Sequence, residues 1–140
     1  MAEEVASYEF GVVLHHAGQG IAELRWDART AEMSDDDFKG GLELLATAAE
    51  SHSTKAILID ATAFRHEFGP GIMEWRDATI IPRYAAAGVT KFAFHMPAGY
   101  PDTAEAGRER EHEGPAPYPT QWFAEREHAL RWLGEEAAGS

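Results

Sequence analysis

Residues 55–87 constrain the fold of this chain more than any other stretch. They open with Ala56-Ile-Leu-Ile-Asp60, a short run of apolar and mostly β-branched side chains that is typical of a strand buried on both faces. A helix is predicted from Pro70, because proline suits the first helical position. A buried strand followed so closely by a helix indicates the central βα unit of a layered α/β domain.

The other elements follow from two periodicities. Alternating apolar and polar residues predict strands, and apolar residues three and four apart predict helices. Ser34 is a suitable N-cap for one helix, and Gly88 is a natural end for the next. The expected elements are strands at 8–16 and 21–26, a helix after Ser34, the strand ending at Asp60, a helix at 70–87, strands at 90–96 and 120–123, and a helix at 125–137.

This order, ββαβαβ(β)α, predicts an α/β fold with a mixed sheet of four to five strands flanked by helices. A chain of 140 residues is long enough for one domain with a sizeable core. We expect a single domain, 1–140, with its core at about residues 8–133 and a long loop or lid at 97–118, where proline, glycine and charged residues are frequent.

Charge and composition disfavour several function classes. Twenty-four acidic residues against twelve basic ones give a formal net charge of −12, which repels nucleic-acid phosphates and anionic lipid headgroups. There are no cysteines, so disulfides, thiolate nucleophiles and cysteine-ligated metals are excluded. No apolar run is long enough to span a membrane, and the acidic N-terminus lacks a signal core. We expect a cytoplasmic protein without a nucleic-acid partner.

Several short segments match one known family in their order and spacing. They are the strand ending in Trp26, the strand ending in Asp60, Trp75 in the following helix, Gly88-Val-Thr-Lys-Phe-Ala-Phe94, and the closing Trp122-Phe123 with Glu127-His-Ala-Leu-Arg-Trp-Leu133. Together they resemble the SpoIIAA-like family, single-domain relatives of the STAS and Sec14-type folds. The resemblance spans roughly residues 8–133 and implies a mixed sheet flanked by helices.

The resemblance implies two kinds of function. Its regulatory branch, the anti-anti-sigma factors, carries a phosphorylatable serine after the strand that ends in aspartate, in a pattern like Asp-Ser-Ser-Gly. This chain has Asp60-Ala-Thr-Ala63, where only Thr62 could accept phosphate and the glycine is missing. The Sec14-type lipid binders instead imply an apolar ligand lying between a helix and the sheet.

Aromatic residues gather in the loop and first helical turn after the buried strand. Phenylalanines in a loop need something to cover them. Either they cap the core beneath residues 97–118, or they form the mouth of an apolar pocket or a dimer contact. In the pocket hypothesis Trp75 supplies contact area and Tyr100 is a wall residue. The predicted ligand-binding residues are Phe64, His66, Phe68, Ile72, Trp75 and Tyr100.

Polar features of the same loop have competing interpretations. His66 beside Glu67 has the residue types for acid–base chemistry, but neighbours on an extended loop usually point apart. Gly69-Pro70-Gly71 offers backbone N–H groups to an anion, or is simply the start of a helix. His15 and His16 point to opposite faces of a strand and cannot chelate one metal together. We predict no catalytic residue, no metal and no cofactor.

The predicted function is therefore non-enzymatic binding of an apolar or lipid-like small molecule, in a pocket between the helix that starts at Pro70 and the sheet. The first alternative is a protein-interaction or regulatory STAS-like module that acts as a homodimer or through a partner. The second is a small enzyme that uses His66 as a general base.

Overall fold

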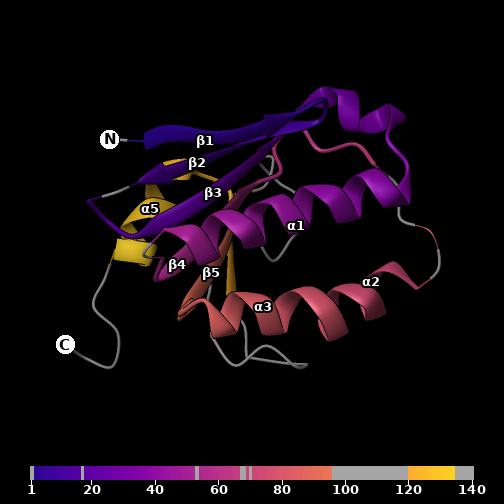
Figure 1. Ribbon diagram of the computed structural model, residues 1–140. Helices are drawn as coiled ribbons and strands as arrows, with labels where there is room; N and C mark the ends of the chain where they lie inside the picture. Colours follow the sequence, from indigo (N-terminus) through magenta and orange to yellow (C-terminus); the bar gives the residue numbers. More distant parts are fainter. Residues whose placement is uncertain are drawn as a thin grey trace.

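The computed structural model describes residues 2–16, 18–52, 54–66, 69, 71–95 and 120–134. In these ranges the chain forms one mixed sheet with helices on both faces (Figure 1). The strands are β1 (Ala2–Tyr8), β2 (Gly11–His16), β3 (Ile21–Trp26), β4 (Ala56–Asp60), β5 (Lys91–His95) and β6 (Thr120–Phe123). The helical elements are a 3₁₀ turn at Ala28–Glu32, α1 (Asp35–Ser51), α2 (Ile72–Trp75), a π-helical segment at Arg76–Ile80, α3 (Ile81–Ala86) and α5 (Arg126–Gly134).

The strands follow one another across the sheet in chain order, from β1 to β6. β1, β2 and β3 pair antiparallel, whereas β3 to β6 are parallel. Helices α1 and α2–α3 lie side by side on one face, and α5 lies behind the sheet on the other (Figure 1). The predicted α/β class, the mixed sheet and the β2–β3 hairpin are confirmed. No helix in the described ranges is both long and apolar enough to cross a membrane.

The sheet has six strands, one more than the upper end of the predicted range. The difference arises at residues 8–16, where a tight turn at Glu9 and Phe10 divides the predicted strand into the end of β1 and the whole of β2. As a result, Tyr8 and Val13 share the face that packs against α1, and Val12 lies on the opposite face. The predicted single stripe through the run is therefore wrong after the turn, because Tyr8 and Gly11 pair directly across it and share a face although they are three residues apart.

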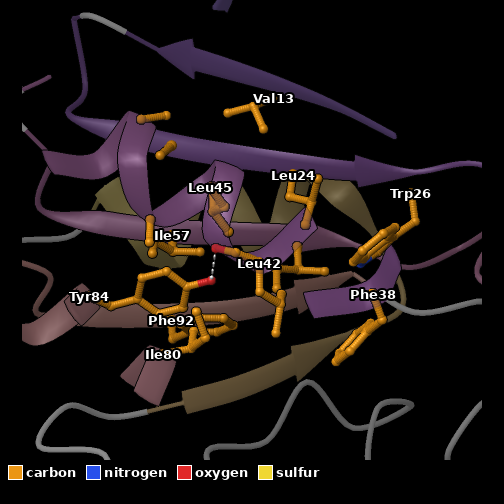
Figure 2. Packing of buried hydrophobic residues seen from close by; sticks show 14 of the residues in the cluster. Val13, Leu24, Trp26, Phe38, Leu42, Leu45, Ile57, Ile80, Tyr84 and Phe92 are labelled. Atoms are coloured by element: carbon orange, nitrogen blue, oxygen red, sulfur yellow. Dashed lines mark hydrogen bonds between the residues drawn. The ribbon is translucent and has the colours of Figure 1, made fainter. Parts of the chain in front are cut away.

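The main core lies between the sheet and the helices α1, α2 and α3. Every residue of β4 is buried, as predicted for a strand covered on both faces. The predicted apolar stripe of α1 is also buried in full. Tyr84 of α3 crosses this core and donates a hydrogen bond of 3.3 Å to the carbonyl oxygen of Leu42 (Figure 2). The stripe consists of Phe38, Leu42, Leu45 and Ala49.

Helix α1 begins with a capping box and packs closely on the sheet. Ser34 accepts a hydrogen bond from the backbone of Asp37, whose carboxylate accepts one from the backbone of Ser34. A side chain at Gly41 would lie 2.5 Å from both the Trp26 ring and the Tyr8 hydroxyl. The same addition at Gly40 would meet nothing within 4 Å. Close approach to the sheet therefore explains only the second of the two glycines.

The helix expected at 70–87 is divided by a wider turn. Its middle, Arg76–Ile80, is π-helical, and the backbone N–H of Ile81 donates to the carbonyl of Arg76, five residues earlier. Pro82 follows immediately and lacks the N–H that a regular α-helix would use, which accounts for the interruption at this point. Gly88, at φ +106°, ends α3 as predicted.

A smaller core lies on the other face of the sheet, beneath α5. It joins the alternate residues of β3, β4 and β5 to the inner side of α5. Its buried members are Ile21, Ala56, Leu58, Ala93, Phe123, Ala129 and Leu133. The sheet therefore separates a large core on the α1 side from a small one on the α5 side.

Candidate functional site

The aromatic loop after β4 closes one end of the main core. The Phe64 ring packs edge-on against Trp26, with ring centroids 5.3 Å apart, and against Phe38 at 6.1 Å. Trp26 and Phe38 are themselves stacked at 5.6 Å, and Figure 2 shows both at that end of the core. Phe64 remains half-buried. It therefore contributes to the core and also presents part of its ring at the surface.

His66 is tied to the start of α1. Its Nε2 lies 2.8 Å from Oδ1 of Asp35, and its side chain is only 7% exposed. The backbone N–H of Gly69 donates to the same carboxylate oxygen at 3.2 Å. The hydrogen bonds from His66 and Gly69 lower the pKa of Asp35. The Gly69 N–H, one donor of the predicted anion-binding segment, thus faces a carboxylate of the chain itself.

Ile72 and Trp75 occupy opposite ends of α2 and differ in exposure. Ile72 is 3% exposed and belongs to the main core. Trp75 is half-buried and packs against that core from its edge. Nζ of Lys39, on α1, lies 5.3 Å from the centroid of the Trp75 ring, a cation–π contact. Trp75, at the end of α2, therefore brings an apolar ring next to the ammonium group of Lys39 on α1.

The structure brings Phe64 and His66 together, with ring centroids 6.2 Å apart, and sets Phe64, Ile72 and Trp75 in or against one core. Phe68 and Tyr100 lie outside the described residues, as does the expected lid at 97–118. The predicted ligand set is therefore described at Phe64, His66, Ile72 and Trp75.

Thr62, the one candidate for phosphorylation, is held by Asp60. The Thr62 hydroxyl donates to Oδ1 of Asp60 at 2.7 Å, and the Thr62 backbone N–H donates to the same atom at 3.1 Å. A phosphate at Thr62 would remove one of these donors and place more negative charge beside the carboxylate. This geometry argues against a phosphoswitch at this position.

A buried ionic network on the α5 side of the sheet was not predicted from the sequence. Glu23, on β3, is 0% exposed and accepts two hydrogen bonds from Arg126 of α5, at 2.6 and 2.7 Å. His16 lies 2.8 Å from the same carboxylate, and Arg25 approaches it at 3.2 Å. Burial raises the pKa of Glu23, but the hydrogen bonds from Arg126 and His16 outweigh it and lower that pKa.

The alternation of side chains between the two faces of β3 gave a partial indication of this network. Glu23 lies between Ile21 and Arg25 on the face opposite Leu24, and a helix covering that face would bury it. Its main partner, however, is 103 residues away in the sequence. A charged residue at a strand position also fits a solvent-facing side, so periodicity alone could not identify the ion pair.

Among the described residues, no group of three or more His, Asp or Glu side chains could hold a metal ion. Comparison with known proteins finds no matching family model, and no similar curated protein or solved structure.

Proposed function

We propose that this domain is a non-enzymatic binding protein that takes an apolar or lipid-like small molecule beside α2, between that helix and the sheet. The observation that supports the proposal is the pair of half-buried aromatic rings, Phe64 and Trp75, at the edge of the main core. Partly covered aromatic rings offer a large apolar area at a small cost in conformational entropy. The resemblance to the SpoIIAA-like and Sec14-type folds points to the same position for a ligand.

The backbone beside Trp75 supports the same site. Trp75 is the last residue of α2, and the π-helical segment begins at the next residue, Arg76. Single turns of π-helix occur frequently at functional sites, because they widen the helix locally and re-aim its side chains. Ile72, buried on the inner side of the same helix, would form the floor beneath the ligand.

Lys39 gives the proposed binding site a positively charged group. Its ammonium group lies against the Trp75 ring and close to the start of α1. An apolar acid could place its chain on Trp75 and its carboxylate on Lys39. The loop at Gly69 is a poorer place for that carboxylate than the sequence indicated, because Asp35 already accepts its hydrogen bond. We therefore infer a fatty acid or a similar apolar acid as the ligand class.

The same half-buried surface favours one alternative, a STAS-like interaction module. An exposed part of Trp75 could meet a second copy of the chain instead of a small molecule. Enzymatic use of His66 fits the geometry less well, because its ring is nearly buried and bonded to Asp35. The alternative predicts a dimer by light scattering that Trp75→Ala converts to a monomer.

Calorimetric titration with palmitate tests the proposal. We expect saturable binding to the wild type, and a loss of affinity of about tenfold or more in Trp75→Ala, since about 1.4 kcal/mol of lost contact corresponds to tenfold. Trp132→Ala is a matched control, because Trp132 also has a lysine against its ring, with Lys91 Nζ at 5.0 Å, but lies on α5. Absence of binding, or equal loss in both variants, would contradict the proposal.

A further inference from the structure

Three polar side chains form a row across the sheet on the face opposite α1. Arg25 pairs with Asp60 in the parallel register of β3 and β4, and Asp60 pairs with His95 in the register of β4 and β5. Each lies at or next to the carboxyl end of its strand. The row therefore lies along the carboxyl edge of three neighbouring parallel strands, the edge at which open α/β sheets bind their ligands.

The apolar packing of α5 ends before it reaches this row. Two residues earlier on β4 and β5, Leu58 and Ala93 are fully buried in the small core under α5. The row itself is partly open: the side chains of Asp60 and His95 are 11% and 15% exposed, and that of Arg25 is 44% exposed. The row is therefore most exposed at its Arg25 end, which gives a small molecule an approach from solvent.

Each member of the row has hydrogen-bonding capacity that the described residues leave unused. Nδ1 of His95 is buried and has no hydrogen-bond partner there, since its nearest carboxylate atom, Oδ1 of Asp60, is 3.8 Å away. Within the described part of the chain, Oδ2 of Asp60 has only Nε of Arg25 beside it, at 3.7 Å. Arg25 donates to Glu23 from Nε and Nη2, and Nη1 donates to no described residue. Buried polar atoms are rarely left without a partner, and such an atom marks a place for an outside group.

The charges of the row select the class of that outside group. Arg25 and Asp60 balance each other, and Glu23 beneath them is paired with Arg126. The row thus has no excess charge to attract an ion. A metal ion is disfavoured too, because the described residues gather no group of three or more side chains that could hold one. An uncharged molecule with several hydroxyl groups carries no charge to be repelled and can form hydrogen bonds with all three side chains.

We propose that Arg25, Asp60 and His95 bind an uncharged polyhydroxylated small molecule of the sugar or polyol class. One hydroxyl donates to Oδ2 of Asp60 and accepts from Nη1 of Arg25. A neighbouring hydroxyl donates to Nδ1 of His95. Thr62 keeps the Asp60 carboxylate in place through its two hydrogen bonds to Oδ1, so that Oδ2 is left for the ligand. This site lies on the other side of the sheet from Trp75 and is independent of the proposed apolar site.

Nuclear magnetic resonance of the labelled full chain tests the proposal with three probes: D-glucose, D-ribose and myo-inositol. We expect at least one probe to give saturable shifts of the His95 imidazole and Arg25 side-chain signals. Asp60→Asn and Arg25→Gln should each lower that affinity by about tenfold, because each removes a charged hydrogen-bond partner. Retained signal dispersion in both variants would show that they fold.

His128→Gln is the control for this experiment. His128 lies on α5 with its side chain 52% exposed and 3.7 Å from Glu125, so it is a histidine beside a carboxylate but outside the row. Its substitution should leave the affinity unchanged. The proposal is overturned if none of the probes shifts the His95 signal, or if the shifts grow without saturation and persist in Asp60→Asn and Arg25→Gln.

Discussion

At the scale of single residues, the buried Glu23 carboxylate is the most consequential group in this molecule. It is fully buried, yet both of its oxygens accept hydrogen bonds from a guanidinium group of α5. Breaking a buried ion pair by removing one partner costs far more than losing an exposed pair, because a desolvated charge is left behind. Glu23 therefore holds α5 on the sheet by satisfying Arg126.

We predict that Glu23→Gln lowers the free energy of unfolding by about 3 kcal/mol, by analogy with other broken buried pairs. The matched control is Glu9→Gln. Glu9 pairs with Arg29 at 3.2 Å, but both side chains are about 60% exposed, so its loss should cost under about 1 kcal/mol. Urea unfolding of both variants measures the difference. Equal, small losses would show that the network does not stabilise the fold.

Asp60 makes the free energy of unfolding depend on pH in the acidic range. Burial raises its pKa, but the nearby His95 ring and the hydrogen bonds from Thr62 outweigh this and lower the pKa from 3.8 to about 2. The unfolded chain therefore binds the proton first. The stabilisation, on the order of 2 kcal/mol, is present above about pH 5 and is lost as the pH falls towards 2.

Asp60→Asn should remove this pH-dependent stabilisation. We expect the variant to be less stable than the wild type at pH 7 and the difference to disappear near pH 2, as seen in urea midpoints measured across that range. Asparagine can still accept the Thr62 hydrogen bonds through its amide oxygen, so the comparison isolates the charge. A difference that stays constant with pH would contradict the lowered pKa.

At the scale of elements, helix α1 can approach the sheet closely because its second glycine, Gly41, has no side chain. Trp26 and Tyr8 occupy the space that a side chain at Gly41 would need, whereas Gly40 faces open space. Glycine costs a helix up to about 1 kcal/mol relative to alanine. One glycine of the pair is therefore required for packing, and the other only weakens the helix.

We predict opposite effects for the two alanine substitutions. Gly40→Ala should raise the free energy of unfolding by about 0.5–1 kcal/mol, the gain in helix propensity. Gly41→Ala should lower it by about 1–3 kcal/mol, because the methyl group would displace the Trp26 ring. Thermal unfolding of the two variants checks this directly. Similar effects in both would mean that Trp26 can move aside at little cost.

The elements that the sequence predicts well are those defined by local signals. The Ser34 cap, the stripe of α1 and the buried strand β4 each depend on residues within one element. The break at residues 9–10 lacks the usual hairpin turn residues, and Phe10 continues the apolar alternation across it. Pro82 indicates locally that the helix is interrupted, but a proline does not specify that the interruption takes the form of a π-helical segment at Arg76–Ile80.

The candidate site was predictable only in part, for a related physical reason. Aromatic residues in a loop are visible in the sequence, so Phe64 and Trp75 could be selected. That both remain half-buried depends on packing with Trp26, Phe38 and Lys39 from distant segments, which the local sequence does not reveal. The row of Arg25, Asp60 and His95 depends on strand register, which pairs residues from three strands.

At the scale of the whole molecule, the sheet separates two chemically different faces. The α1 side ends in half-buried aromatic rings with a lysine against one of them, and the α5 side ends in a polar row above an ion pair. The apolar site and the polar row therefore belong to opposite faces, and substitutions in one should not alter binding at the other. We propose that the first of these faces binds an apolar molecule.

Native mass spectrometry of the chain, purified without detergent, tests this claim most directly. We predict a species heavier than the free chain by the mass of an apolar molecule, weakened in Trp75→Ala and retained in Trp132→Ala. A free monomer that also fails to take up added palmitate would contradict the claim. A free dimer abolished by Trp75→Ala would assign the same surface to self-association instead.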